Sequence, residues 1–159
     1  MKYHMRRSER QFKEWTVIEE ILRKGKYATL ALCRNNEPYI VTLNYGYDPA
    51  NRSLYFHCAK EGLKTDFVTV NPNVCAMVIQ DNGYIQNECE HAYRSVVIRG
   101  RVDILTEEDE RRQAIDVLLN HLEERPEIMR AKLRDRTEKL RIVQIWRLVI
   151  EDVCGKEGS

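Results

Sequence analysis

A short segment, Tyr55–Asp66 (YFHCAKEGLKTD), carries the residue types best suited to hold an anion. Its pattern predicts a strand that ends at His57-Cys58, then a short loop, then a helix that begins near Gly62. Backbone N–H groups at a helix start lack intrahelical partners and carry partial positive charge, so they stabilise an anion. Lys64 falls in that first turn, where its charge opposes the helix dipole unless an anion offsets it.

Two further donors, His57 and Lys60, strengthen the interpretation of this segment as a phosphate site. The alternative is that Lys60 and Lys64 are solvated surface lysines and that His57 is an ordinary strand histidine, which residue type alone favours. His57 and Cys58 do not form a nucleophile pair by adjacency, because neighbouring side chains of a strand point to opposite faces.

A second segment, Val41–Tyr47 (VTLNYGY), places Thr42, Asn44 and Gly46 on one face of an expected strand and apolar residues on the other. A face of small polar residues beside exposed backbone can receive a flat heteroaromatic ring. The alternative is an edge strand whose polar face is wet.

A third segment, Tyr93–Arg101 (YRSVVIRGR), begins with Arg94 and Ser95, which could clamp an anion at a strand start. The last apolar run, IVQIWRLVI, contains Trp146. Its ring is by type a core residue, although in a barrel that holds an aromatic ligand it could also form a pocket wall.

The elements that must position these residues follow from periodicity and turn signals. We expect helices over 16–25, 62–70, 106–125 and near 127–139, and strands over 27–33, 37–47, 53–58, 74–79, 93–105 and 141–153, with 81–92 turn-like and a bend or bulge at Gly100. Several of these six strands follow one another in sequence with short turns, so they should pair antiparallel. This favours a small barrel over a doubly wound parallel sheet.

The composition is that of one globular domain: 159 residues, 43% hydrophobic, with 26 basic and 25 acidic residues. The balanced charge argues against a dedicated nucleic-acid binder. No apolar run approaches the ~18 residues of a membrane-spanning helix. The five cysteines are scattered and form no CxxC motif, which favours a protein of the reducing cytoplasm. Cys89-Glu90-His91 offers too few ligands to predict a metal site.

Three stretches taken together resemble the FMN-binding split-barrel family related to pyridoxamine 5′-phosphate oxidase, and most closely its nitroimidazole-resistance-like (Nim-like) flavoproteins. They are LALCRNNEPYIVTLNYGYD, LYFHCAKEGLKTDFVTVNPNVC and YRSVVIRGRVDIL. The resemblance covers roughly residues 15–105, with the closing strand 141–155. It implies a mainly β fold with flanking helices, a six-stranded antiparallel split barrel. The single domain 1–159 would have a flexible arm (1–14), a helical insertion (106–139) and a tail (156–159).

The resemblance also implies a homodimer with FMN at its interface, and a set of cofactor-binding residues. These are Thr42, Leu43 and Asn44 along the isoalloxazine edge, His57, Cys58 and Ala59 beside the ribityl chain, Gly62, Lys64, Arg94 and Ser95 at the phosphate, and Trp146 near the ring, from either subunit. No separate acid or base is required for hydride transfer at a flavin, so His57 is only a candidate proton donor. No metal is expected.

The expected function is that of an FMN-dependent oxidoreductase, a flavin reductase or nitroreductase-like enzyme, acting on a small electron-poor substrate with a nicotinamide donor. Two alternatives stay open: a flavin-binding or sensing protein without dedicated turnover, and a split-barrel relative that binds haem or a deazaflavin. The chain is shorter than a true pyridoxamine phosphate oxidase and lacks its C-terminal substrate-binding segment. That specific activity is therefore not expected.

Overall fold

The computed structural model describes residues 5–134 and 142–158 of the chain. In chain order the elements are η1 (Ser8–Arg10), β1 (Gln11–Phe12), α1 (Trp15–Lys24), β2 (Tyr27–Arg34), β3 (Glu37–Asn44), β4 (Gly46–Asp48), β5 (Ser53–Ala59), α2 (Leu63–Val70), β6 (Asn73–Ile85), β7 (Glu90–Leu105), α3 (Glu108–Leu122), α4 (Pro126–Arg134) and β8 (Val143–Gly158). Every strand pair is antiparallel, and the sheet order is β3-β2-β6-β7-β8-β5-β4, with β1 added to β8.

The expected class, a mainly β antiparallel split barrel with flanking helices, is confirmed, but the described residues contain eight strands rather than six. One of the two additional strands is the short β1, which lies in the segment expected to be a flexible arm. The other arises because the expected strand 37–47 breaks at Tyr45. The ring of Tyr45 is buried and its hydroxyl donates to the Leu22 carbonyl at 2.7 Å, so the chain turns there between β3 and β4.

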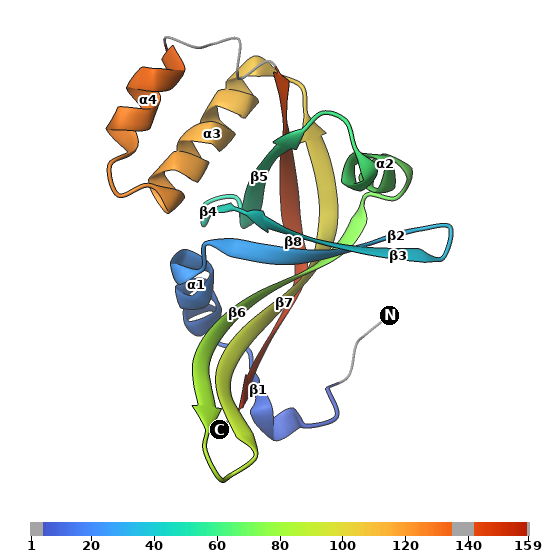
Figure 1. The fold of residues 1–159 in the computed structure, drawn as a ribbon, viewed down its shortest axis with the longest axis vertical. Helices are drawn as coiled ribbons and strands as arrows, with labels where there is room; N and C mark the ends of the chain where they lie inside the picture. The colour runs from blue at the N-terminus through green and yellow to red at the C-terminus, as the bar shows by residue number, and fades with distance from the viewer. Residues whose placement is uncertain (1–4, 135–141, 159) are drawn as a thin grey trace.

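The split in the barrel lies where β3 approaches β5 (Figure 1). Strand β3 pairs with β2 along its whole length, and the two central residues of their hairpin, Asn35 and Asn36, both have positive φ, as a type I′ turn requires. No ladder joins β3 to β5 among the described strands. Both strands therefore keep backbone groups that neighbouring strands do not use.

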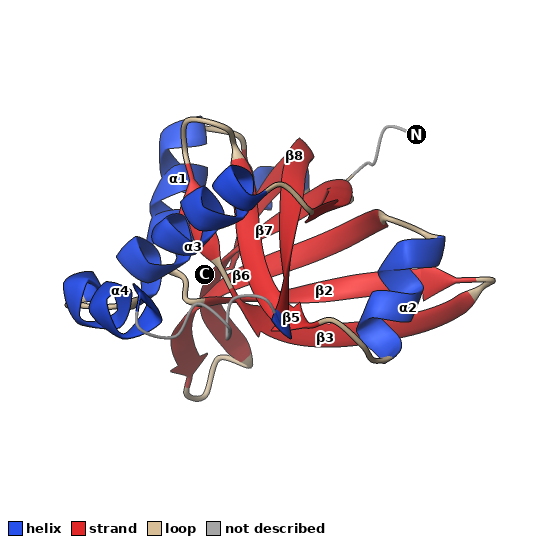
Figure 2. Ribbon diagram, turned by 90° about the horizontal axis from the view of Figure 1, so that it is seen from above, coloured by secondary structure: helices blue, strands red, loops and turns tan. Residues whose placement is uncertain are grey.

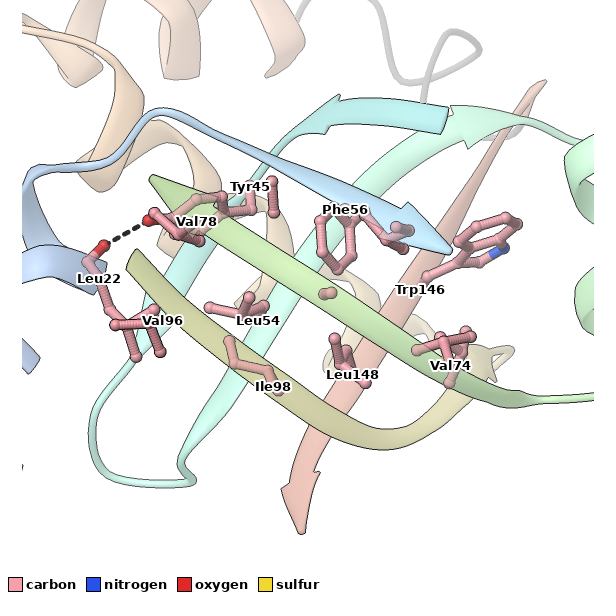
Figure 3. Close-up of a cluster of buried hydrophobic side chains, with 14 of the residues drawn as sticks. Leu22, Tyr45, Leu54, Phe56, Val74, Val78, Val96, Ile98, Trp146 and Leu148 are labelled. Carbon is pink, nitrogen blue, oxygen red and sulfur yellow. Dashed lines mark hydrogen bonds between the residues drawn. The ribbon is translucent and has the colours of Figure 1, made fainter. Parts of the chain in front are cut away.

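The barrel interior holds the larger of two hydrophobic clusters (Figure 3). Alternate residues of each strand point inward, as the period of a half-buried strand requires. Large buried side chains of this cluster include Tyr45, Leu54, Phe56, Ile98, Trp146 and Leu148. A second cluster joins Ala114 and Leu118 of α3 to Tyr55 and Ile145 on the outside of β5 and β8. Figure 2 shows α1, α3 and α4 gathered on one side of the barrel and α2 on the other.

Two segments are more ordered than their sequences suggest. The polar stretch 81–92, expected to be turn-like, instead extends the β6–β7 hairpin, with a register shift between Asp81 and Tyr84. The expected tail 156–159 continues β8 as far as Gly158, where β7 and β1 pair with it. The first segment pairs with itself across the β6–β7 turn, and the second pairs with strands from distant sequence. In both places backbone pairing forms the strand without an alternating apolar pattern in its side chains.

The predicted irregularity at Gly100 is confirmed, because the register of β7 with β8 shifts between Arg99 and Gly100. Arg99 faces Asp152 and Gly100 faces Ile150, so β8 carries one extra residue, Glu151. A Cβ at position 100 would lie 1.9 Å from the Val149 carbonyl oxygen. Only glycine permits this close approach.

The expected insertion 106–139 forms α3 and α4 where it is described, and its residues from 135 lie outside the described part of the chain. The last turn of α3 is tied to the α1–β2 connection by His121, whose Nε2 donates to the Gly25 carbonyl at 2.6 Å. The ring of His121 also lies 5.0 Å from that of Tyr45, between centroids. This contact holds the insertion against the barrel.

Stability should decrease as the pH falls through the range in which histidine titrates. Burial lowers the pKa of His121, and the charges of Lys26 and Arg23 act in the same direction, while the bond to Gly25 opposes them. The unfolded chain therefore binds this proton at a higher pH than the folded chain, and folding loses free energy below about pH 6.5. Thermal melts between about pH 7.5 and 5.5 should show a falling Tm, and His121→Gln should flatten that slope because it removes the titrating ring.

Candidate functional site

The junction of β5 and α2 has the geometry expected of an anion site. Gly62 precedes the helix with φ of 125°, a backbone conformation that glycine adopts without strain. Its carbonyl accepts bonds from Thr65 and Asp66, and no side chain caps the helix. Among the hydrogen bonds of the described residues, none uses the N–H groups of Leu63 and Lys64. These two donors are available to a ligand.

Lys64 brings a positive charge to the same turn. Its side chain is half-buried, and it has no ion-pair partner among the described residues. Burial raises the pKa of Cys58 to about 11, and the Lys64 ammonium partly opposes that rise. Cys58 is therefore a neutral thiol at physiological pH rather than a nucleophile. The lysine and the open N–H groups together match the charge and acceptor capacity of a phosphate.

The structure brings the second candidate segment to the split in the barrel. Thr42 and Asn44 are exposed on the outer side of β3, and Leu43 points the other way. The Thr42 Oγ1 lies 3.0 Å from the Thr29 Oγ1, and the Asn44 Nδ2 donates to the Lys26 carbonyl at 2.9 Å. The expectation that Gly46 shares this face is wrong, because Gly46 is buried in β4 against the backbone of α3.

The end of β5 forms the other side of the split. His57 and Ala59 are exposed, whereas the side chain of Cys58 is buried. From Phe56 to Ala59 this strand pairs only with β8 among the described strands, since β4 reaches no further than Tyr55. The backbone of His57, Cys58 and Ala59 is thus open toward β3.

Arg94 and Ser95 lie far from Lys64 within one chain. The Arg94 Nη2 donates to the Gln80 Oε1 at 3.1 Å and lies 3.7 Å from the Glu20 Oε1 of α1. Ser95 is buried, and its Oγ is 3.5 Å from the Lys156 carbonyl oxygen. Helices α1 and α2 lie on opposite sides of the barrel (Figure 1). One chain therefore does not bring the two halves of the expected phosphate site together.

Trp146 is a core residue in this structure. Its side chain is 0% exposed, it pairs with Phe56 across the β5–β8 ladder, and its Nε1 donates to the Gln144 Oε1 at 2.7 Å. The sequence left open whether this ring is a core residue or a pocket wall. Within one chain it is a core residue. Among the described residues, no three His, Cys, Asp or Glu side chains group as metal ligands, and no helix is long and apolar enough to cross a membrane.

One feature near the site was missed from the sequence: the outer side of β3, β2, β6 and β7 is mostly apolar. We call the exposed or half-buried residues of this surface the outer sheet face: Tyr27, Thr29, Ala31, Ile40, Thr42, Asn44, Cys75, Met77, Ile79, Val97 and Arg99. Ser95 pairs with Ile79 and so belongs to the same side. The signal was the near-continuous apolar character of 27–33 and 74–79, which is typical of strands covered on both faces.

The model of the pyridoxamine 5′-phosphate oxidase family matches residues 14–157. Among proteins of curated function, none matches this chain in sequence. A Bacteroides thetaiotaomicron structure, provisionally named a 5-nitroimidazole antibiotic resistance protein, has a TM-score of 0.75 at 23% identity, over 93% of this chain and 86% of that one. An FAD-binding protein from Mesorhizobium loti has a TM-score of 0.68 at 23% identity, over 94% and 98%. The FAD and haem binding protein of Mycobacterium smegmatis has a TM-score of 0.74 at 18% identity, over 94% and 74%.

The fold and the open β3–β5 edge define a split barrel with flanking helices. Because the family model spans nearly the whole chain, the protein belongs to the pyridoxamine 5′-phosphate oxidase family. The family resemblance indicated by the sequence is thereby confirmed, and a structure associated with nitroimidazole resistance is among the similar folds. At these identities the similar structures establish the fold alone.

Proposed function

We propose that this protein is an FMN-dependent oxidoreductase that acts on a small electron-poor substrate, with a nicotinamide as electron donor. The observation that carries the proposal is the β5–α2 junction, where the open N–H groups of Leu63 and Lys64 lie beside the Lys64 charge. This donor set fits the phosphate of FMN. Membership of a family of flavin-binding split barrels supports the same assignment.

In this proposal each segment of the site has a separate task. Lys64 and the helix start hold the phosphate, the backbone of 57–59 lies along the ribityl chain, and the backbone of 42–44 contacts the edge of the ring. When bound, the flavin supplies the redox chemistry, and the protein supplies orientation and electrostatics. His57, exposed near the end of strand β5, is the candidate proton donor to a reduced substrate.

The proposal includes a homodimer with the cofactor between the two copies. Arg94 and Ser95 lie far from Lys64 in one chain, so they reach the same phosphate only as residues of a second copy. The outer sheet face supports this arrangement, because most of its residues are apolar and solvent-accessible. It also carries Thr42 and Asn44, and the buried Ser95 lies on the same side of the sheet. A sheet face of this kind is a typical protein interface.

The location that we propose is the cytoplasm. All five cysteines lie in the described part of the chain, and all are free. Free cysteines in this number favour a reducing compartment.

FMN should bind more tightly than riboflavin, because only FMN carries the phosphate that Lys64 would hold. Charge-assisted hydrogen bonds contribute about 1.5–3 kcal/mol each, so the ratio of the two dissociation constants should be at least about tenfold. Fluorescence titration of the apoprotein with FMN, FAD and riboflavin measures it. Equal affinity for FMN and riboflavin would contradict the phosphate site, and a preference for FAD would change the cofactor but keep the site.

Absorbance and turnover separate this function from its alternatives. A bound flavin gives an absorbance band at about 450 nm, whereas a bound haem gives a Soret band. Oxidation of a nicotinamide in the presence of a nitroaromatic acceptor distinguishes an enzyme from a flavin-binding protein without turnover.

A further inference from the structure

A cavity separate from the β3–β5 split lies between α3, α4 and the part of the barrel where β7 ends and β8 begins. It has a volume of about 1040 Å³. Its apolar lining comes from three elements, with Ile104 and Leu105 at the end of β7, Ile115 and Leu119 on α3 and Leu133 on α4. A cavity of this size is large enough for a drug-sized or nucleotide-sized ligand, and an apolar lining with a few polar groups is typical of ligand sites.

The charged residues that line this cavity in the described part of the chain are mostly basic. Among the described residues, five basic side chains line it, namely Lys60, Arg111, Arg112, Arg130 and Arg134, and two acidic ones, Glu108 and Asp116. Each acidic group already has a partner among the five. Arg112 pairs with Glu108, and the Arg130 Nε lies 2.8 Å from the Asp116 Oδ1.

The remaining cations differ in what they contact. Arg111 donates to the carbonyls of Leu105 and Val143, at 3.2 and 3.0 Å, and so fixes the start of α3 to the end of β7 and the start of β8. Lys60 and Arg134 have no carboxylate partner among the described residues. They approach the cavity from two different elements, the β5–α2 loop and α4. An anion placed between them would be attracted from both sides.

We propose that this cavity binds an organic anion with an apolar body, such as an aromatic carboxylate. The apolar lining receives the body, and Lys60 and Arg134 hold the carboxylate. The cavity is distinct from the β3–β5 split, and the proposal does not depend on flavin binding. Lys60 nevertheless belongs to the loop that leads into Gly62, so an occupant of the cavity would lie next to the proposed phosphate site.

The probes are naphthalene-2-carboxylate and naphthalene-2-carboxamide, which share a ring system and differ in charge. Isothermal titration calorimetry, with and without saturating FMN, should show the carboxylate binding about tenfold or more tightly than the carboxamide, since a charge-assisted bond is stronger than a neutral one. The variant Arg134→Glu should weaken carboxylate binding about tenfold or more and leave the carboxamide nearly unchanged. Lys132→Glu is the matched control, because it makes the same charge change on the same helix at a residue outside the cavity.

A third variant, Leu133→Trp, fills the cavity from its partly exposed side and should reduce the binding of both probes. Thermal melts of all variants verify that each is folded. Failure of the carboxylate to bind, equal affinity for the two probes, or equal effects of Arg134→Glu and Lys132→Glu would each overturn the proposal. Carboxylate binding is expected in the flavin-free protein too. A failure of the carboxylate to bind therefore does not bear on the proposed cofactor, and a failure of FMN to bind does not bear on the cavity.

Discussion

Met77→Glu should convert the protein to a monomer and lower its affinity for FMN at least about tenfold. Met77 lies near the centre of the outer sheet face, in a row that runs from Thr42 through Thr29 and Met77 to Val97. If two copies pack through this face, a twofold axis brings both new carboxylates into the interface. Burying an unpaired charge costs several kcal/mol, which exceeds what a few lost apolar contacts would remove.

The fold of one chain should tolerate this change, because the Met77 side chain is 39% exposed. Ile128→Glu is the matched control, since Ile128 on α4 is also 39% exposed but lies away from the outer sheet face. Light scattering and FMN titration on both variants provide the measurement. A Met77→Glu dimer would show that another surface forms the interface. A monomer that binds FMN as tightly as the wild type would show that the cofactor site is complete within one chain.

Lys64→Ala should weaken FMN binding by about 1–3 kcal/mol, or about 5- to 150-fold, without loss of the fold. The lysine lies in the first turn of α2, whose Leu63 and Lys64 N–H groups have no partner among the described residues. A positive charge is unfavourable at a helix start unless an anion is bound. The substitution should therefore destabilise the FMN-bound protein and leave the apoprotein unchanged or slightly more stable.

A pair of thermal melts, of apoprotein and FMN-saturated protein, tests this together with a cofactor titration. Lys132→Ala is the control, because Lys132 is an exposed lysine on α4, away from the residues proposed to hold the phosphate. A mutant apoprotein that melts far below the wild type would make Lys64 a structural residue. Unchanged FMN affinity would move the phosphate elsewhere, with Lys60 and Arg94 as the next candidates.

The β5–α2 junction could be predicted from sequence because all its determinants are local. A strand pattern ends, a glycine follows, and a helical pattern begins, so the first turn and its lysine are fixed within about ten residues. The same holds for the β2–β3 hairpin, where Asn35 and Asn36 supply the positive φ values of the turn. The irregularity at Gly100 was predictable for a related reason, since a glycine inside a long strand pattern commonly marks a bulge.

The rest depended on contacts between distant parts of the chain. The burial of Tyr45, which divides one expected strand into β3 and β4, requires the carbonyl of Leu22 as a partner. The distance between Arg94 and Lys64 depends on which strands lie between β7 and α2, and the local pattern does not encode that order. The β6–β7 extension has polar residues on both faces, so periodicity gave no indication of a strand there.

The position of β8 has a consequence for how the chain folds during synthesis. This strand is the last of the described strands in the sequence. In the sheet, however, it lies between β7 and β5, and it also pairs with β1. Until residues 143–158 have left the ribosome, the inner edges of β5 and β7 have no neighbour, and the apolar side chains that Trp146 and Leu148 cover stay exposed. Pairings this remote in sequence form slowly, and open strand edges are prone to aggregation. A nascent chain halted before Val143 should therefore recruit chaperones, and a chain in which residues 143–158 have emerged should not.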